Sequence, residues 1–327
     1  MTSYLDAADH ADIFVPHAFD EHTVDLGEIR MNYVVAGDDQ NPALLLIPAQ
    51  TESWWGYEAA ITLLADRFQV YAVDLRGQGR STWTPGRYTL DIFGNDLVRF
   101  LDLVVGRPAV VSGLSSGGTI AAWLAAFSKP GQIRAVMLED TPLFASEANP
   151  SVGQSIRQGI APMFTLWHKW LGNQWSIGDW TGMQRALPDE LPASMVQALA
   201  GMVPAGSGTT PSGPPQDLIE YDPEWGDAFG SGRATASCDH EAMLTHAKVP
   251  VLLTHHFHQI DPLTGALMGA ISDLQAAHVD HLVTAAGQPF TYRSFPHMPH
   301  SMHGHDPKLY ADTLTEWYPT LPDVAAV

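Results

Sequence analysis

Cysteine is almost absent from this chain of 327 residues, which carries only Cys238. A single thiol excludes an internal disulfide framework and fits a reducing compartment, so we expect a cytoplasmic protein. Basic residues are also scarce, since 16 Lys and Arg stand against 36 Asp and Glu and leave a formal charge of −20. Such a charge repels phosphate backbones and anionic lipid surfaces, and we expect neither a nucleic acid nor a membrane partner.

Long apolar runs are missing as well. No run approaches the ~20 residues that a membrane-spanning helix needs. The first residues, "MTSYLDAADHADIF", contain neither a basic n-region nor an apolar h-region, so no signal peptide is expected. Hydrophobic residues nevertheless make up 45% of the chain, which is enough for a large core. The composition therefore predicts an acidic, soluble, globular protein.

Short apolar runs alternate with helix-like stretches through residues 1–142. The expected strands are Ile29–Ala36, Ala43–Ile47, Val70–Val73, Ala109–Ser112 and Ile133–Leu138. The expected helices between them are Tyr57–Asp66, Leu90–Val105 and Thr119–Phe127. Uniformly apolar strands joined by crossover helices predict an α/β fold, with a mostly parallel twisted sheet and helices on both faces.

The pattern changes over residues 143–245, which hold five of the ten tryptophans and the loop "PAGSGTTPSGPP". Helices are expected there over Ser155–Leu171 and Leu191–Met202. Strand-like runs return at Val249–Thr254 and Phe290–Phe295, and a last helix is expected over Pro307–Trp317. We therefore predict one core built from residues 1–142, including an N-terminal arm, and 246–327. A mainly helical cap over 143–245 interrupts it.

The segment from Gly113 to Gly117 has the sequence Gly-Leu-Ser-Ser-Gly, between an apolar strand and a helix of small residues. This spacing in this context is typical of a nucleophile elbow, a strained turn that exposes a serine hydroxyl. The spacing makes Ser115 the nucleophile and gives the backbone N–H of Ser116 to the oxyanion hole. The second oxyanion donor should follow the strand "ALLLIP", where Gln50 is the candidate.

The general base should follow the last strand, where "FPHMPHSMHGHDP" offers four histidines. His300 stands seven residues before Pro307, the expected first residue of the last helix. Related hydrolases carry their catalytic histidine at this distance from such a proline, so we expect His300 to be the base. We expect His297, His303 and His305 to be loop or subunit-contact residues.

No metal site is expected in this segment, because Pro296 and Pro299 break any helix that would align the histidines. The histidines of "THHFH", which are His255, His256 and His258, invite the same idea. Since strand side chains alternate between faces, they should not converge, and we interpret them as structural. We expect no cofactor either.

Two positions compete for the acid that orients the base. One is Asp261, after the strand "PVLLTHH", and the other is Asp140, which ends "IRAVMLED" beside Glu139. Because side chains alternate along a strand, only one of Glu139 and Asp140 can face the histidine. The residue pattern leaves Asp140 and Asp261 equally placed.

Longer blocks carry a resemblance to a known family. They are "NPALLLIPAQTESWWGYE", "VDLRGQGRSTWTPGRYTLDIFGNDLVRF", "PGQIRA", "NQWSIGDW", "YDPEWG" and "THH…IDP…GAL". Together they resemble the zearalenone lactonases, in their bacterial branch, which have the α/β-hydrolase fold. The resemblance implies hydrolysis of the macrocyclic ester of resorcylic acid lactones, without metal or cofactor, by a homo-oligomer. It maps the family's serine to Ser115, its histidine to His300 and its acid to Asp140, where fungal-type members carry Glu.

A tryptophan-rich cap suits an apolar substrate with a flat aromatic ring. The candidate substrate contacts are Met163, Phe164, Trp167, Trp170 and Trp180. Two alternatives keep the same triad residues: a general carboxylesterase for other apolar esters, which differs only in its pocket, and a ligand receptor with weak hydrolysis. Both would bind a small apolar molecule.

Overall fold

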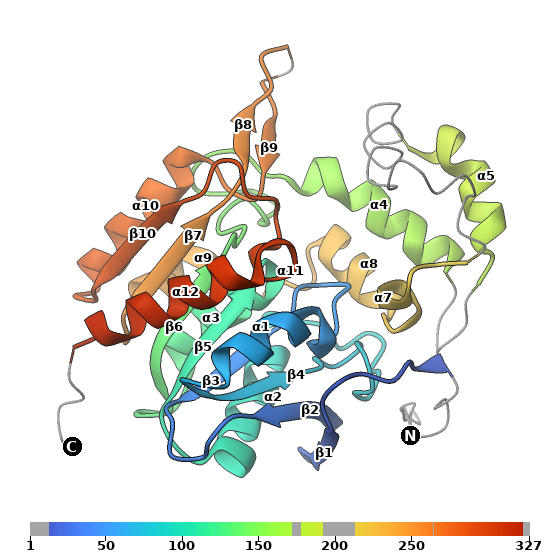
Figure 1. Cartoon of the computed structure of the whole chain (residues 1–327). Coiled ribbons are helices and arrows are strands. Elements are labelled where there is room, and N and C mark those ends of the chain that lie inside the picture. Colours follow the sequence, from blue (N-terminus) through green and yellow to red (C-terminus); the bar gives the residue numbers. More distant parts are fainter. Residues whose placement is uncertain (1–12, 172–177, 192–212, 264, 323–327) are drawn as a thin grey trace.

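The computed structural model describes residues 13–171, 178–191, 213–263 and 265–322. An eight-stranded sheet runs through them in the order β1-β2-β4-β3-β5-β6-β7-β10 (Figure 1). Its strands are β1 (Glu21–Asp25), β2 (Arg30–Ala36), β3 (Ala43–Ile47), β4 (Gln69–Val73), β5 (Ala109–Leu114), β6 (Ile133–Glu139), β7 (Val251–His255) and β10 (Phe290–Ser294). The β1–β2 and β2–β4 pairs are antiparallel, and the pairs from β4 through β10 are parallel.

Helices cover both faces of this sheet, which explains why its central strands are apolar throughout. In β3, Leu45 belongs to a hydrophobic cluster that includes residues of the helices α2 (Leu90–Phe100), α3 (Ser116–Phe127) and α10 (Asp273–Ala285). The neighbouring Leu44 and Leu46 belong to a second cluster that includes residues of α1 (Glu58–Leu64) and α12 (Pro307–Trp317). Both sets of strand side chains are therefore removed from water, as expected for a parallel sheet.

The elements described between β6 and β7 are helices. They are α4 (Arg157–Trp170), α5 (Trp180–Glu190), α7 (Gln216–Ile219), α8 (Pro223–Ser231) and α9 (His240–Thr245). Figure 1 shows α4, α5, α7 and α8 together on the right of the view, apart from α10 and α12 on the left. In contrast, α9 packs against α3 and α10. The expected helix Leu191–Met202 extends outside the described residues.

Several elements were not expected from the sequence, among them three that lie outside the helices α5, α7, α8, α9 and α11 (Met302–His305). One is β1, and another is the hairpin of β8 (His258–Ile260) and β9 (Leu267–Gly269), which projects beyond the sheet in Figure 1. The third is α10, which begins with a capping box between Ser272 and Gln275. None of the helices in the described ranges has the length and apolar character to cross a membrane.

Candidate active site

Ser115 lies at the sharp turn between β5 and α3. Its φ of 55° and ψ of −116° are a strained conformation for a residue with a side chain. The two flanking glycines make the turn possible. A Cβ on Gly113 would lie 2.4 Å from the carbonyl carbon of Gly117, and a Cβ on Gly117 would lie 2.4 Å from the carbonyl oxygen of Ile47. The backbone packing thus requires glycine at both positions.

Gln50 follows β3 and lies against the start of α3. Its backbone N–H donates to Ser116 Oγ at 2.7 Å, and its side-chain amide donates to the Tyr221 hydroxyl at 2.5 Å. A hydrogen bond holds the loop that carries Gln50, because the Gln78 side-chain amide donates to the Ala49 carbonyl at 2.7 Å. The N–H of Gln50 therefore faces the N-terminus of α3, where backbone donors stabilise negative charge.

His300 and Asp140 form the central polar pair of the site. His300 Nδ1 lies 2.6 Å from Asp140 Oδ2, and the two side chains are 50% and 2% exposed. Since the carboxylate accepts a hydrogen bond from Nδ1–H, the neutral imidazole keeps its lone pair on Nε2, as a general base requires. Burial lowers the pKa of His300, but the hydrogen bond and charge of Asp140, with the charges of Glu139 and Glu52, raise it above its ordinary value.

His256 fixes both members of this pair, a role that was not foreseen. Its backbone N–H donates to Asp140 Oδ1 at 3.0 Å. Its ring Nδ1–H donates to the carbonyls of Pro299 and His300, each at 2.9 Å. His256 is fully buried, so the residue that directly follows β7 positions the acid and also the loop of the base.

Asp261 lies elsewhere, in the connection between β8 and β9. Its Oδ1 accepts from the backbone N–H of Leu263 at 2.7 Å, and Leu263 is 94% exposed. The carboxylate that the structure places on His300 is therefore that of Asp140.

His303 is not a surface loop residue, so that expectation was wrong. It is fully buried, with Nδ1 2.8 Å from Glu139 Oε2 and Nε2 2.8 Å from Glu52 Oε1. Both ring nitrogens then donate, which is the cationic form. Burial lowers the pKa of His303, but the two carboxylates outweigh this and raise it to about 10. In contrast, His297 and His305 are exposed.

A cavity of about 1010 Å³ joins these groups. Its lining includes the five polar residues expected to carry the chemistry, which are Gln50, Ser115, Ser116, Asp140 and His300. The apolar lining comes from α2, α3, α4, α8 and the β8–β9 hairpin: Phe93, Ile120, Ile160, Phe164, Trp225, Phe229 and Leu267. A few polar groups in an otherwise apolar cavity are typical of a small-molecule site.

The expected substrate contacts agree with this cavity only in part. Phe164 lines it, and so does Trp225, which was not among the candidates. Trp167, Trp170 and Trp180 pack against the main hydrophobic core, and Met163 is buried within it. None of these four is found among the described residues that line the cavity. The number of tryptophans predicted an apolar cap, but a count of residues does not show which side of each helix faces the cavity.

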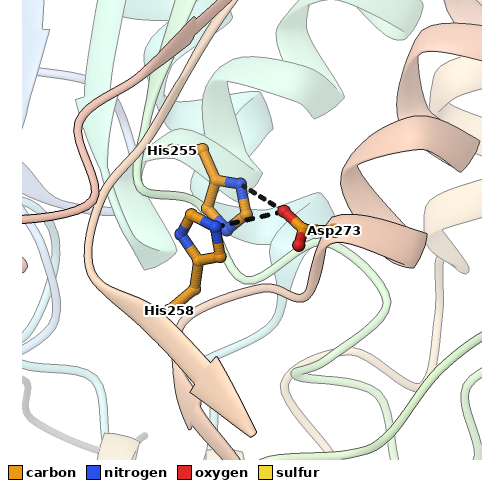
Figure 2. Close-up of side chains that lie close together, drawn as sticks. All are labelled: His255, His258 and Asp273. Atoms are coloured by element: carbon orange, nitrogen blue, oxygen red, sulfur yellow. Dashed lines mark ion pairs between the residues drawn. The ribbon is translucent and has the colours of Figure 1, made fainter.

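His255 and His258 also differ from expectation. They were predicted not to converge, yet their rings stack with centroids 3.6 Å apart, and both face Asp273 (Figure 2). The strand alternation rule failed here because the chain leaves β7 at His255 and turns before β8 begins at His258.

Comparison with known proteins agrees with this architecture. The family model described as "alpha/beta hydrolase fold" matches residues 42–169. Bifunctional epoxide hydrolase 2 of Sus scrofa is 33% identical over 132 residues, which cover 39% of this chain and 23% of that protein. The 3-oxoadipate enol-lactonase 2 of Acinetobacter baylyi is 28% identical over 144 residues, covering 43% of this chain and 54% of that protein. The chain thus spans about a quarter to half of these relatives.

Solved structures extend the similarity over most of the chain. The enol-lactonase from Burkholderia xenovorans LB400 superposes with a TM-score of 0.57 at 18% identity, covering 91% of this chain and all (100%) of that one. A hydrolase from Pseudomonas aeruginosa PA01 superposes with a TM-score of 0.58 at 19% identity, covering 92% and 100%. The predicted fold is thereby confirmed: the chain has the α/β-hydrolase fold, and it is related in sequence to enol-lactonases and epoxide hydrolases.

Proposed function

We propose that this chain is a serine hydrolase that opens the macrocyclic ester of zearalenone-type resorcylic acid lactones. The observation that carries the proposal is the Asp140–His300 pair, which lines the same apolar cavity as the strained Ser115. An elbow serine, an oriented histidine and a buried carboxylate are the groups that acyl transfer needs.

The reaction follows from these positions. His300 Nε2 takes the Ser115 proton as Oγ bonds to the lactone carbonyl carbon. The backbone N–H of Ser116 holds the oxyanion together with that of Gln50, which exchanges its hydrogen bond to Ser116 Oγ for one to the oxyanion. One such donor contributes about 3–4 kcal/mol. The ring C–O bond then breaks, and His300 returns its proton to the departing alkoxide. Water, deprotonated by His300, then bonds to the acyl carbon. The bond from that carbon to Ser115 Oγ breaks, and His300 returns the proton to Oγ as the acid leaves.

Ester hydrolysis fits this site better than epoxide hydrolysis, although the similar proteins include both an enol-lactonase and epoxide hydrolases. A serine oxygen that opens an epoxide would leave a serine ether, which water does not release. A serine oxygen that attacks an ester leaves an acyl-enzyme, which water does release. The elbow serine therefore favours the lactonase relationship over the epoxide hydrolase relationship.

The size and character of the cavity support a large apolar ester. Its volume of about 1010 Å³ lies at the upper end of the usual range of roughly 300–1,000 Å³ for small-molecule sites. Aromatic side chains on its wall, such as Phe93, Phe164 and Trp225, suit an aromatic ring with an aliphatic macrocycle. The alternatives are a general carboxylesterase of apolar esters and a ligand receptor with little turnover.

A chromatographic time course tests the proposal. Zearalenone and a short-chain p-nitrophenyl ester are incubated with the wild type and with Ser115→Ala. We expect ring-opened product from the wild type and a loss of several orders of magnitude in the variant. Turnover of the short ester alone would point to the general esterase. Turnover of neither by a folded protein, with zearalenone still bound, would point to the receptor.

We further propose a homo-oligomer in a reducing compartment, with no cofactor and with a small apolar ester as its partner. The single cysteine, Cys238, is free and buried, which suits such a compartment. Light scattering tests the oligomer, because a monomer mass would contradict it.

A further inference from the structure

A second cluster of ligand-type side chains lies where β7 ends, β8 begins and α10 begins. His255 ends β7, His258 begins β8 and Asp273 is the first residue of α10. Asp273 Oδ1 lies 3.1 Å from His258 Nε2 and 4.0 Å from His255 Nδ1. The three ligand atoms all lie within 4.8 Å of one another, and Figure 2 shows both rings directed at the carboxylate.

Hydrogen bonds to the protein backbone fix the tautomer of each histidine. His255 Nε2 lies 2.7 Å from the Ile271 carbonyl, and His258 Nδ1 lies 2.5 Å from the His256 carbonyl. Because a carbonyl oxygen only accepts, these two ring nitrogens carry the hydrogens. The two remaining ring nitrogens, His255 Nδ1 and His258 Nε2, are the atoms nearest Asp273. Because His258 Nε2 lies 3.1 Å from that carboxylate, it donates to it until a metal ion displaces the proton. Metal-binding histidines are oriented by this same type of backbone contact.

Burial and charge also suit a cation. His255 is fully buried, and its hydrogen bond to the Ile271 carbonyl through Nε2 leaves Nδ1 for a metal ion. The side chains of His258 and Asp273 are 16% and 82% exposed, so an ion can enter from solvent. The chain's net charge of −20 favours the approach of any cation.

We propose that His255, His258 and Asp273 form a binding site for a divalent transition-metal ion, of which Zn²⁺ is the best match. Two imidazole nitrogens, one carboxylate oxygen and a water are a common tetrahedral set for zinc. Bonds of about 2.0–2.1 Å place neighbouring ligand atoms roughly 3.3 Å apart in that geometry. The separations of 3.1 and 4.0 Å from Asp273 Oδ1 lie on either side of this value.

Binding needs small movements of His258, Asp273 and Tyr292, whereas the fully buried His255 stays in place. His258 tilts out of its stack with His255, and the Asp273 side chain turns toward the ion. The Tyr292 hydroxyl, which donates to His255 Nδ1 at 2.8 Å, releases that nitrogen and turns to the metal-bound water. The ion then joins the end of β7, the β8–β9 hairpin and the start of α10. Since the hairpin residues Leu267 and Gly269 line the cavity, the ion would fix part of that wall.

Calorimetry on the full, EDTA-treated chain tests the site with ZnCl₂ as the titrant. The informative variants are His258→Gln and Asp273→Asn, and the matched control is His281→Gln, an exposed histidine on the same helix α10. Loss of a group that only orients a metal ligand costs about 10–100-fold in affinity. We therefore expect the zinc affinity of this site to fall by more than about 100-fold in each ligand variant, and to stay unchanged in the control.

A Co²⁺ titration gives an independent readout, because tetrahedral Co²⁺ with nitrogen and oxygen ligands absorbs visible light strongly. That absorption should appear in the wild type and the control, and be lost in both ligand variants. Circular dichroism without metal checks that the variants fold. Absence of a tight zinc site in the wild type, or equal binding by all four proteins, would overturn the proposal. Neither outcome depends on hydrolytic activity.

Discussion

Glu139 and Asp140 are neighbours in the chain, yet each carboxylate binds a different histidine: Glu139 contacts His303 and Asp140 contacts His300. The two side chains point apart at the end of β6, where Asp140 has a positive φ of 39°. The pair with Asp140 faces the cavity, whereas the pair with Glu139 is fully buried. The end of β6 thus supplies one carboxylate to the proposed catalytic base, His300, and a second carboxylate to the buried, cationic His303.

Asp140→Asn should separate the two candidate acids. The amide keeps the shape of the side chain but cannot stabilise the His300 cation, and the corresponding change in a serine protease triad lowers kcat about 10⁴-fold. We expect a loss of similar order in ester hydrolysis. Asp261→Asn is the matched control and should retain activity, because Asp261 lies in the β8–β9 connection. A larger loss in Asp261→Asn than in Asp140→Asn would reverse the assignment.

The pH dependence of hydrolysis should reflect the raised pKa of His300. Only the neutral imidazole accepts the Ser115 proton, so kcat/KM should fall as the pH decreases through this pKa. Because Asp140, Glu139 and Glu52 raise the pKa, the midpoint should lie above the ordinary value of 6.5. A profile of kcat/KM against pH measures it, with circular dichroism to confirm folding at each pH. A midpoint at or below 6.5 would contradict the proposed charge environment.

The buried His303 cation should make the folded state less stable as the pH rises. Its folded pKa of about 10 exceeds the ordinary 6.5, so its stabilisation is complete below 6.5 and decreases as the pH rises toward 10. One bound proton corresponds to at most about 1.4 kcal/mol per pH unit. Urea unfolding at pH 7 and pH 9 measures this slope.

The variant Glu139→Gln tests the origin of that slope. It leaves a buried histidine with one carboxylate, Glu52, and should reduce the free energy of unfolding at pH 7 by roughly 3–5 kcal/mol. It should also flatten the decrease between pH 7 and pH 9, because the pKa of His303 falls. An unchanged slope in the variant would assign the pH effect to other groups.

Ser116→Ala should distinguish the two adjacent serines. Ser116 contributes its backbone N–H to the proposed oxyanion hole, and its hydroxyl only accepts from Gln50 N. One neutral hydrogen bond contributes about 0.5–1.5 kcal/mol, so activity should remain within about tenfold of the wild type. Initial rates of ester hydrolysis compare it with Ser115→Ala. Equal, severe losses in both variants would mean that the hydroxyl of Ser116 takes part in the chemistry.

Much of the fold could be predicted because its signals are local. The strand Ala43–Ile47 and the helix Pro307–Trp317 have the predicted bounds, since one is uniformly apolar and the other begins at a proline. In contrast, β1 was missed because it is an edge strand with a largely exposed and polar sequence, "EHTVD". The helix α10 was missed although the sequence "SDLQ" holds its capping box.

The parts of the candidate site that could be predicted are those set by residues close together in the sequence. The elbow around Ser115 is fixed by glycines two residues away on each side. The choice between Asp140 and Asp261 depends on a contact between residues 160 positions apart, which no local pattern contains. Similarly, the number of tryptophans predicted an apolar cap, but the choice of Trp225 over Trp167 depends on how α4 and α8 pack.

The separation of Asp140 from His300 also bears on how the protein acquires activity during synthesis. The elbow and the acid emerge from the ribosome well before the base, and contacts of such long range form slowly. The segment after β10 is tied to the centre of the sheet by Glu139, which accepts from the backbone N–H of Met302, and by Tyr310, which donates to Ser112. Under the proposed function, a nascent chain therefore stays chemically inert until the segment after β10 docks, and hydrolysis begins only then.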